Sequence, residues 1–399
     1  MSDQEIAIHP SAFAEAAIDA AKAHGRAVLK FISPNDVGDT GSHQCGYLLP
    51  KHAWQAFTSI PPEKILGDTN PKEDVSVIWQ DGRKTGSVIT WYGRKTRSEY
   101  RLTRFGREFP YLTKDSIGSL LILVPYQEKC FLAFVLDTDA DFESIESALG
   151  VSFLKGWALF DAAIPSAEET EDDCLKRHFS ELIAAHARFP TALTISGAVQ
   201  AAIEGCIKNI HSASPDHQLV LLMQLEYELF RMLERKICQA EITRLFKDVD
   251  DFIRTASSIM NRRKSRAGKS LENHVAFLLS KSGIPFESQP PIDGEPDIVV
   301  PSSLAYLDPD FPVEKLIVMG LKTTCKDRWR QVLNEGKRVP KKHLLTMQQG
   351  ISDNQLKQMR AANVSLVVPK NIHNEYPPLH RPFLLSVEQF IRHAKQIHG

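Results

Sequence analysis

The segment 316-LIVMGLKTTCKDRWRQVLNEG-336 changes character within a few residues. Its first part is an apolar run, which is typical of a strand buried on both faces. Its second part mixes charged and apolar residues at helical spacing and predicts an amphipathic helix over 327–336. Lys322 stands at the junction of the two. A lysine at the end of a core strand requires a reason, and the candidates are catalysis, binding and plain solvation.

Outward from this segment, the C-terminal half shows helix and strand patterns in alternation. This alternation predicts a mixed α/β sheet flanked by helices. The strands are expected at 297–300, 313–322, 343–348 and 364–369. The helices are expected at 196–210, 217–237, 268–283, 327–336 and 353–362.

The N-terminal half is different, because short segments with strand character follow one another with turns between them. The alanine-rich stretch 11–31 has apolar residues at helical spacing and predicts one helix before these strands. The strands are expected at 45–49, 75–79, 87–92, 119–124 and 130–136. We therefore expect a β-rich barrel or sandwich with a few helices, giving an α+β or α/β multidomain protein.

An acidic stretch separates the two halves. Ile164 to Asp173 contains a proline and five acids, with no strongly apolar residue after Pro165, which predicts an exposed linker. A chain of 399 residues exceeds the size at which single cores stop growing. We expect domains at 1–163 and 177–399, joined by a linker over 164–176.

The composition excludes several classes of protein. Apolar residues make up 43% and charged residues 24% of the chain, and no window is apolar enough to span a membrane. The N-terminal residues lack the pattern of a signal peptide, so we expect a cytoplasmic protein. The six cysteines form no CxxC pair and show no cysteine–histidine spacing of the zinc type. We expect reduced thiols.

The net charge is −1, so affinity for a polyanion must come from local clusters of basic residues. Two such clusters occur, at 94–107 and 261–269. For either cluster alone, a solvated charged face is the more common explanation. Two clusters in one chain keep binding to nucleic acid open.

The first candidate for chemistry is the pair of Asp297 and Lys322, which lie at the ends of two successive predicted strands. If these strands pair, the two side chains meet at one edge of the sheet. A carboxylate beside a lysine suits metal-assisted phosphodiester cleavage, in which the acid holds Mg²⁺ and the lysine assists the attacking water. The simpler alternative is that Asp297 caps a strand and Lys322 extends into solvent.

The pattern is incomplete, because nucleases of the PD-(D/E)xK design carry a second acid two residues before the lysine. Here that position is Gly320. One carboxylate alone would hold Mg²⁺ loosely, so another acid is needed. Glu335, thirteen residues after Lys322, and Glu272, on the preceding predicted helix, are the candidates. Glu272 is also explained as a carboxylate favoured by a helix dipole.

Four segments together resemble one family of nucleases. They are 256-ASSIMNRRKSRAGKSLENH-274, Asp297, 321-LKTTCKDRWRQVLNEG-336 and 366-LVVPKNIHNEYP-377. They resemble the EcoRII-type restriction endonucleases, a branch of the PD-(D/E)xK superfamily in which the glutamate has migrated to thirteen residues after the lysine. The resemblance implies that Asp297, Lys322 and Glu335 are catalytic, with Asp297 and Glu335 as Mg²⁺ ligands. It leaves Glu272 a supporting role.

The resemblance also implies residues that read DNA. Lys326, Asp327 and Arg328 match positions that contact C·G pairs in the major groove, where Lys and Arg donate to guanine and Asp accepts from cytosine. Tyr227 matches the ring that stacks on a flipped base, and Gln224 stands where the family has arginine. An exposed turn of helix for the triplet, and core or dimer packing for Tyr227, are the plain alternatives.

The N-terminal half resembles the effector-binding domain of this family, a DNA-binding pseudobarrel, in 33–46 and 95–107. The positions that match contacts to effector DNA are His43, Lys95, Arg97, Glu99 and Arg101. Tyr100 replaces a lysine of the family, which puts one contact in question. His43 is alternatively an ordinary loop histidine.

The resemblance implies a type IIE restriction endonuclease that makes Mg²⁺-dependent double-strand cuts at a CCWGG- or CCNGG-like site. It implies a homodimer, base flipping, and an N-terminal domain that binds effector DNA and inhibits the nuclease until then. It also implies a restriction–modification system with a cognate DNA cytosine methyltransferase that need not touch this chain. The alternatives are a catalytically silent DNA-binding protein of the same fold and a nuclease without sequence choice.

Overall fold

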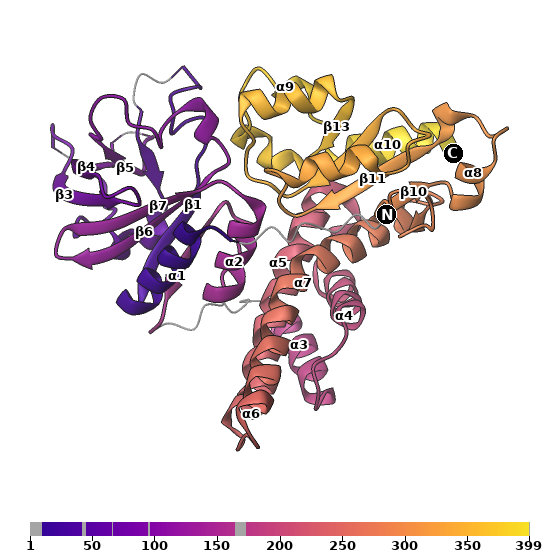
Figure 1. Ribbon diagram of the computed structural model, residues 1–399, viewed down its shortest axis with the longest axis horizontal. Coiled ribbons are helices and arrows are strands. Elements are labelled where there is room, and N and C mark those ends of the chain that lie inside the picture. Colours follow the sequence, from indigo (N-terminus) through magenta and orange to yellow (C-terminus); the bar gives the residue numbers. More distant parts are fainter. Residues whose placement is uncertain (1–9, 42–44, 66, 95, 164–172, 399) are drawn as a thin grey trace. The chain divides into compact units, whose positions relative to one another are not determined.

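The computed structural model describes residues 10–41, 45–65, 67–94, 96–163 and 173–398. The chain forms two compact units (Figure 1). The first unit comprises Met1–Ser166 with two short segments from later in the chain, Gln349–Leu356 and Asn374–Arg381. The second unit comprises the remainder. Of the linker predicted at 164–176, residues 164–172 lie outside the described residues. Residues 173–176 instead form the first turn of helix α3 (Asp173–Ala185).

The first unit is built on one eight-stranded sheet in the order β2-β5-β4-β3-β7-β6-β1-β8. Neighbouring strands in this sheet are antiparallel, except for β3 and β7, which are parallel. The strands are β1 (Arg26–Phe31), β2 (Tyr47–Leu49), β3 (Lys72–Trp79), β4 (Lys84–Tyr92), β5 (Glu99–Thr103), β6 (Leu120–Gln127), β7 (Cys130–Leu136) and β8 (Trp157–Asp161). The β-rich fold class expected for this half is confirmed.

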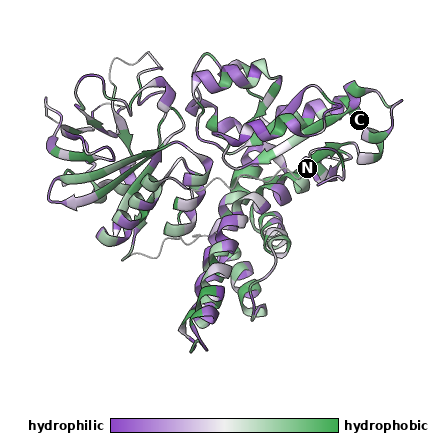
Figure 2. Cartoon of the chain, viewed as in Figure 1, coloured by the Kyte–Doolittle hydropathy of each residue, from purple (hydrophilic) through white to green (hydrophobic). Residues whose placement is uncertain are grey.

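Both faces of this sheet are covered. Helices α1 (Ala12–His24) and α2 (Asp139–Leu149) pack on one face, where their apolar residues join those of β1, β6 and β7. The other face carries an aromatic core that includes Trp79, Trp91 and Tyr100. Short 3-10 helices, η1 (Lys51–Ala56) and η2 (Lys114–Ser116), lie between strands. In Figure 2 hydrophobic colouring follows the strands of this sheet.

The predicted helix over 11–31 is wrong after His24. α1 ends at His24 because Gly25 adopts a left-handed conformation (φ 73°), and the chain then turns into β1. Five of the six residues of β1 are buried, so its apolar run carries no alternation that distinguishes strand from helix. Strands β5 and β8 were not predicted, because β5 lies within a basic cluster.

The second unit combines a helical bundle with a five-stranded mixed sheet in the order β13-β12-β11-β10-β9. Strands β11, β12 and β13 are parallel, whereas β9, β10 and β11 pair antiparallel. The strands are β9 (Glu287–Ser288), β10 (Ile298–Val300), β11 (Ile317–Lys322), β12 (Lys342–Thr346) and β13 (Val364–Val367). This confirms the mixed sheet expected for the C-terminal half.

The helices of the C-terminal half include a long α7, which contacts α4 and α5. The α-helices are α3 (Asp173–Ala185), α4 (Ala192–Cys206), α5 (Pro215–Leu233), α6 (Gln239–Thr243), α7 (Val249–Lys281), α8 (Ser303–Leu307), α9 (Asp353–Ala361) and α10 (Val387–His398). The shorter helices are η3 (Ile210–Ser212), η4 (Glu234–Cys238, a π-helix), η5 (Val313–Lys315), η6 (Arg328–Asn334), η7 (Lys370–Glu375) and η8 (Arg381–Phe383).

Asp216, at the start of α5, ties this bundle to the end of the chain. Its buried carboxylate accepts hydrogen bonds from the backbone N–H groups of Lys370 (2.8 Å), Val387 (2.9 Å) and Glu388 (3.0 Å). Two of these N–H groups begin α10, which cannot satisfy them within the helix. The contact therefore caps α10 and fixes it against α5.

Two expectations for the second unit require correction. The predicted helix over 327–336 is a 3-10 helix, η6, that ends at Asn334. The predicted helix over 268–283 is the last part of α7, which begins at Val249. Within the residues that the structure describes, no helix is long and apolar enough to cross a membrane.

The cysteines also differ from expectation. The structure joins Cys174 and Cys206 in a disulfide between α3 and α4, where reduced thiols were predicted throughout. The other four are free; they are Cys45, Cys130, Cys238 and Cys325. Cys174 and Cys206 are 32 residues apart in the sequence, and this spacing gave no indication that they pair.

We predict that the first unit depends on a buried ion pair. Lys30 Nζ lies 2.7 Å from Asp36 Oδ2, and Asp36, fully buried, also accepts from the N–H groups of Ser33 and Leu48. Asp36→Asn removes the carboxylate that is hydrogen-bonded to the buried Lys30 ammonium and should lower the free energy of unfolding by about 3 kcal/mol. Thermal unfolding measures this.

The control is Asp81→Asn, which removes an exposed pair with Arg83 at 3.6 Å. Such pairs contribute at most about 1 kcal/mol, so its midpoint should stay near that of the parent. Equal unfolding midpoints for both variants would contradict the structural role of Asp36.

Candidate active site

The pairing of β10 with β11 brings Asp297 and Lys322 together at one edge of the sheet. Ile298 is opposite Met319, so Asp297, which immediately precedes β10, comes alongside the end of β11. Asp297 Oδ2 accepts one hydrogen bond from the backbone N–H of Leu321 (2.6 Å) and another from Lys322 Nζ (3.0 Å). Both side chains keep about a fifth of their surface exposed, at 17% and 20%. The pair is therefore oriented yet accessible.

Glu335 reaches the same edge from the end of η6. Its side chain is buried, at 7% exposure. A Cβ atom on Gly320 would lie 3.3 Å from Glu335 Oε2 and only 2.2 Å from Val332 Cγ2. The space in which an acid at position 320 would begin is thus occupied by η6 and its glutamate. Glu335 and η6 can pack here because Gly320 has no side chain.

Burial dominates the electrostatics of Glu335 and raises its pKa to about 7. Asp297 raises the pKa further through like charge, whereas Lys322 and Lys342 lower it. Its Oε2 atom is buried and has no hydrogen-bond partner among the residues described. A buried carboxylate without a donor, beside a second carboxylate, is a chemical fit for a divalent cation with oxygen ligands, such as Mg²⁺.

Backbone contacts hold Glu335 in position from the other side. Gly336 N donates to Asp293 O at 2.7 Å. Gly294 has no room for a side chain, because a Cβ would lie 2.6 Å from the Cα of Glu335. The turn before β10 thereby fixes both the start of the Asp297 strand and the end of η6.

Lys342 is a neighbour of the site that the sequence did not indicate. Its buried ammonium donates to the carbonyl oxygens of Gly336 and Val339, and burial lowers its pKa. It closes the loop that follows Glu335. Lys342 immediately precedes the strand predicted at 343–348, and nothing in the local pattern identifies this role.

Glu272, the alternative second acid, lies on α7 and has partners of its own. Its Oε2 accepts from Lys269 Nζ (2.8 Å) and from the Gln289 side-chain amide (3.0 Å). The backbone N–H of Gln289 in turn donates to Asp297 O (2.9 Å). Glu272 therefore touches the strand of Asp297 indirectly, through Gln289.

Of the three predicted base-reading residues, Lys326 and Asp327 lie between β11 and η6, and Arg328 is the first residue of η6. Lys326 is 2% exposed, whereas Asp327 and Arg328 are half-buried. Contact between Lys326 and a base pair therefore requires exposure of a side chain that is buried in this conformation. Asp327 and Arg328 lie at the start of η6, one short helix before Glu335.

The predicted flipping residues lie one turn apart on α5, and both are half-buried. The guanidinium carbon of Arg266, from α7, lies 4.8 Å from the centroid of the Tyr227 ring. Arg266 belongs to the second basic cluster and is itself buried. Its cation–π contact places beside Tyr227 the positive charge that Gln224 lacks.

The predicted effector contacts are only partly within the described residues. His43 and Lys95 lie outside them. Arg97 is exposed, with its guanidinium carbon 5.8 Å from the centroid of the Tyr92 ring. On β5, Glu99 Oε1 lies 3.7 Å from Arg101 Nη2, and Arg101 is buried at 3% exposure.

Tyr100 points into the core between these two residues. It is fully buried, its hydroxyl donates to Ile60 O at 2.5 Å, and burial raises its pKa to about 12. The Tyr100 ring packs in the core of the first unit and is not exposed at its surface.

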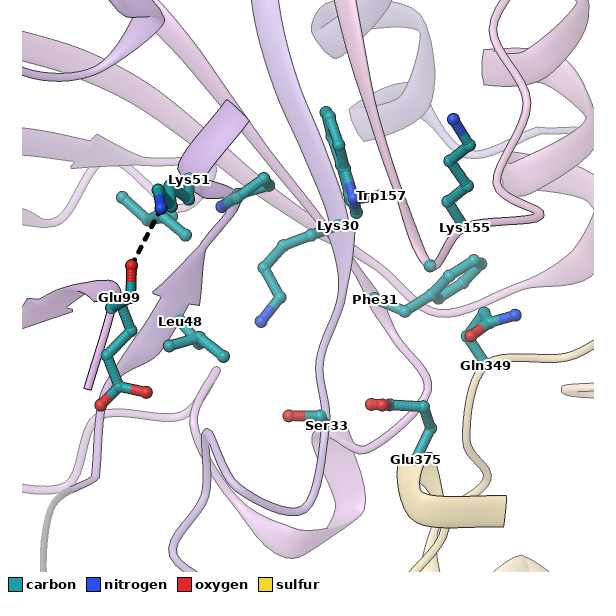
Figure 3. A pocket seen from close by; sticks show the side chains of 14 residues that line it. Lys30, Phe31, Ser33, Leu48, Lys51, Glu99, Lys155, Trp157, Gln349 and Glu375 are labelled. Carbon is teal, nitrogen blue, oxygen red and sulfur yellow. Dashed lines mark hydrogen bonds between the residues drawn. The ribbon is translucent and has the colours of Figure 1, made fainter. Parts of the chain in front are cut away.

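A cavity of about 280 Å³ opens beside β5 in the first unit. Figure 3 shows Lys30, Lys51, Glu99 and Trp157 along it, and Lys51 Nζ donates to Ser98 Oγ at 3.0 Å. Because Lys30 is paired with Asp36, the lysines of this cavity that could contact a phosphate-bearing ligand are Lys51 and Lys155, and Glu99 and Glu375 share the lining. The predicted effector position Glu99 therefore borders a real concavity.

Comparison with known proteins matches both halves of the chain. Residues 22–160 match the model of restriction endonuclease EcoRII, N-terminal, and residues 230–391 match that of EcoRII, C-terminal. The chain is 33% identical to the type II restriction enzyme EcoRII of Escherichia coli, over 91% of this chain and 92% of that protein. The chain belongs to the EcoRII family of restriction endonucleases. It is therefore a type II, site-specific DNA nuclease.

Two solved structures are also similar to the EcoRII-family chain. Metal-depleted Ecl18kI in complex with uncleaved, modified DNA is 20% identical, with a TM-score of 0.45, covering 56% of this chain and 83% of that one. A PspGI–substrate DNA complex is 14% identical, with a TM-score of 0.41, covering 56% and 91%.

We predict that Gly320→Ala disrupts the second unit. The added methyl group would overlap Val332 Cγ2, and overpacking of this kind costs about 1–3 kcal/mol. The midpoint of thermal unfolding and the rate of DNA cleavage should both fall. The matched control is Gly320→Ala with Val332→Ala, which removes the overlapping atom and should recover much of the cleavage activity. Full activity in Gly320→Ala alone would contradict the packing arrangement.

We predict that Glu335 makes metal-free stability depend on pH. Its folded pKa of about 7 exceeds the ordinary 4.5, so the stability it contributes is complete below pH 4.5 and lost as pH rises through 7. Glu335→Gln does not ionise and should be more stable than the parent by up to about 3 kcal/mol at pH 8.5, and by nothing near pH 4.5.

The measurement is thermal unfolding in a chelator at the two pH values. Magnesium should then stabilise the parent at pH 8.5 more than it stabilises Glu335→Gln. A pH-independent difference between the two proteins would show that Glu335 ionises normally.

Proposed function

We propose that this EcoRII-family chain makes Mg²⁺-dependent double-strand cuts at a CCWGG- or CCNGG-like site and acts as a type IIE enzyme. One observation carries the catalytic part. Asp297 contacts Lys322 at 3.0 Å, and the buried Glu335 carboxylate fills the space beside Gly320 where another acid would begin. Three groups from separate parts of the chain thus converge on one edge of the sheet.

In the proposed mechanism, Asp297 and Glu335 would hold Mg²⁺, which would make a water molecule more acidic and offset charge on the phosphate. Lys322 donates one N–H to Asp297, and its remaining donors orient the attacking water or bind a phosphate oxygen. The water oxygen joins phosphorus and gives up a proton to solvent as the bond to the 3′ oxygen breaks, and the departing 3′ oxygen takes up a proton from solvent. The products are 5′-phosphate and 3′-hydroxyl ends.

Recognition is proposed to use the residues next to this site. Lys326, Asp327 and Arg328 would read C·G pairs once the DNA exposes them, Arg and Lys at guanine and Asp at cytosine. Because η6 joins this triplet to Glu335, correct base contacts can position the metal ligand. Tyr227 would stack on a flipped base, with Gln224 as its polar neighbour.

A homodimer is proposed because two strands must be cut at a near-palindromic site. Exposed apolar side chains gather at α6 and the start of α7, and a second copy is a fitting cover for them. They are Ile242 (51% exposed), Leu245 (96%), Val249 (72%), Phe252 (53%) and Ile253 (51%).

The domain expected at 1–163 is proposed to bind effector DNA through His43, Lys95, Arg97, Glu99 and Arg101. By family likeness it would inhibit the nuclease until that DNA is bound, with 164–176 as the linker to the domain at 177–399. The enzyme would act in the cytoplasm, beside a DNA cytosine methyltransferase that protects the host's own sites. A catalytically silent DNA-binding protein is the alternative, and the converging Asp297, Lys322 and Glu335 favour an enzyme.

We predict that Lys322→Ala abolishes cleavage and leaves sequence-specific DNA binding intact, since the lysine acts on the reacting groups. Plasmid digestion and a gel-shift assay with a duplex carrying the site measure the two properties. The control is Lys315→Ala, an exposed lysine just before β11, which should cut at the parental rate. Cleavage by Lys322→Ala at the rate of the parent protein would contradict the assignment of this active site.

We predict that a cleavage-resistant duplex carrying the site accelerates cutting of a single-site plasmid, and that Arg97→Ala requires more of it. Loss of a phosphate contact should also reduce the salt dependence of effector binding by about one counterion. Arg83→Ala, another exposed arginine of the first unit, is the control. Plasmid cutting that ignores the added duplex would contradict the effector role.

A further inference from the structure

A cluster of three metal-binding side chains lies in the helical bundle of the second unit, on elements that the catalytic proposal does not use. Cys174 and His178 lie one turn apart on α3, and Cys206 ends α4. Their potential ligand atoms lie within 4.8 Å of one another, and all three residues are half-buried. Among the described residues, these three side chains form the one group of three or more potential metal ligands that lie this close together.

The structure records the oxidised state of this cluster, in which the two cysteines form a disulfide. His178 Nδ1 lies 3.6 Å from Cys206 Sγ and 4.0 Å from Cys174 Sγ. A histidine against a structural disulfide has no evident purpose in packing. The same three donors, Cys, His and Cys, are a common set for zinc.

We propose that, in the reduced protein, Cys174, His178 and Cys206 bind one Zn²⁺ ion and join α3 to α4 through it. The proposal rests on the cytoplasmic location proposed above, because thiols there are kept reduced. A thiol reductant supplies two electrons and two protons to the disulfide. Binding of Zn²⁺ then releases the two thiol protons as the thiolates bind the metal.

The distances support this arrangement. In a tetrahedral site with Zn–S of about 2.3 Å and Zn–N of about 2.0–2.1 Å, sulfur and nitrogen ligands lie about 3.6 Å apart. The two observed separations from His178 Nδ1 are 3.6 and 4.0 Å. Two sulfur ligands need about 3.8 Å, which rotation of the cysteine side chains on backbones 5.6 Å apart can provide.

The surroundings favour thiolates over thiols. Arg177 Nη2 lies 3.8 Å from Cys174 Sγ, and a nearby guanidinium stabilises the charged sulfur. The one rearrangement required is at His178, whose Nδ1 now lies 3.0 Å from the carbonyl oxygen of Cys174 and must release it to bind metal. Three protein ligands leave a fourth position for water.

The consequence is structural. α3 begins at Asp173, within the linker predicted at 164–176, and its apolar residues Leu175, Phe179 and Ile183 join the core of the bundle. A metal at its first turn would fix the beginning of the nuclease half, in a state distinct from the disulfide. Only one of the two links can exist at a time.

The test uses the full-length chain, reduced with a phosphine, freed of metal by a chelator and titrated with Co²⁺ as a spectroscopic probe. One equivalent should produce a sulfur-to-cobalt charge-transfer band, and Zn²⁺ should abolish it. Carboxylates at Asp297 and Glu335 give no such band, so cobalt at the catalytic site is distinguishable. No cleavage is measured, so failure here leaves the proposed function untouched.

Cys206→Ser should lose at least about half of the band, because one of two sulfur ligands is gone, and His178→Ala, which keeps both cysteines, should weaken Co²⁺ binding at least about tenfold because one of three protein ligands is lost. Cys130→Ser, a half-buried free cysteine elsewhere, is the matched control and should behave as the parent. Circular dichroism confirms folding of each variant. A reduced parent without the band, or a band unchanged in both His178→Ala and Cys206→Ser, would overturn the proposal.

Discussion

The contact between β11 and η6 at Gly320 is the constraint on which the rest of the site depends. A side chain at this position would collide with Val332, so the strand must present bare backbone where η6 crosses it. That close approach carries Glu335 to the end of β11. Asp297, held by the Leu321 N–H and by Lys322, meets it there. In this chain the glycine at position 320 leaves the space that η6 and Glu335 occupy.

This arrangement has an energetic cost that function explains. Glu335 is buried without a hydrogen-bond donor among the described residues, and its pKa rises to about 7. A site selected only for stability would remove such a group or pair it. A divalent cation would neutralise it, which couples metal binding to the stability of the second unit. Binding of the cation would therefore increase the free energy of unfolding of the second unit.

Much of this was predictable from the sequence, and the limits have physical causes. The apolar run before Lys322 predicted β11, and the order of the strands predicted that Asp297 and Lys322 meet. The assignment of Glu335, thirteen residues after Lys322, came from family likeness. The local sequence pattern predicted an α-helix over 327–336 and did not indicate the 3-10 helix that positions this glutamate. The strand β1 was mistaken for helix, since a fully buried strand lacks alternation. The disulfide and the role of Lys342 depend on contacts between distant segments, which no local pattern records.

The central claim is that Asp297 and Glu335 share one metal ion beside Lys322. Anomalous diffraction from crystals of the Lys322→Ala protein bound to its DNA site and Mn²⁺ tests it most directly. The account predicts a peak within about 2.2 Å of both carboxylates, as expected for a small divalent cation with oxygen ligands. A peak held by Asp297 and Glu272, with Glu335 still buried and unbound, would contradict it.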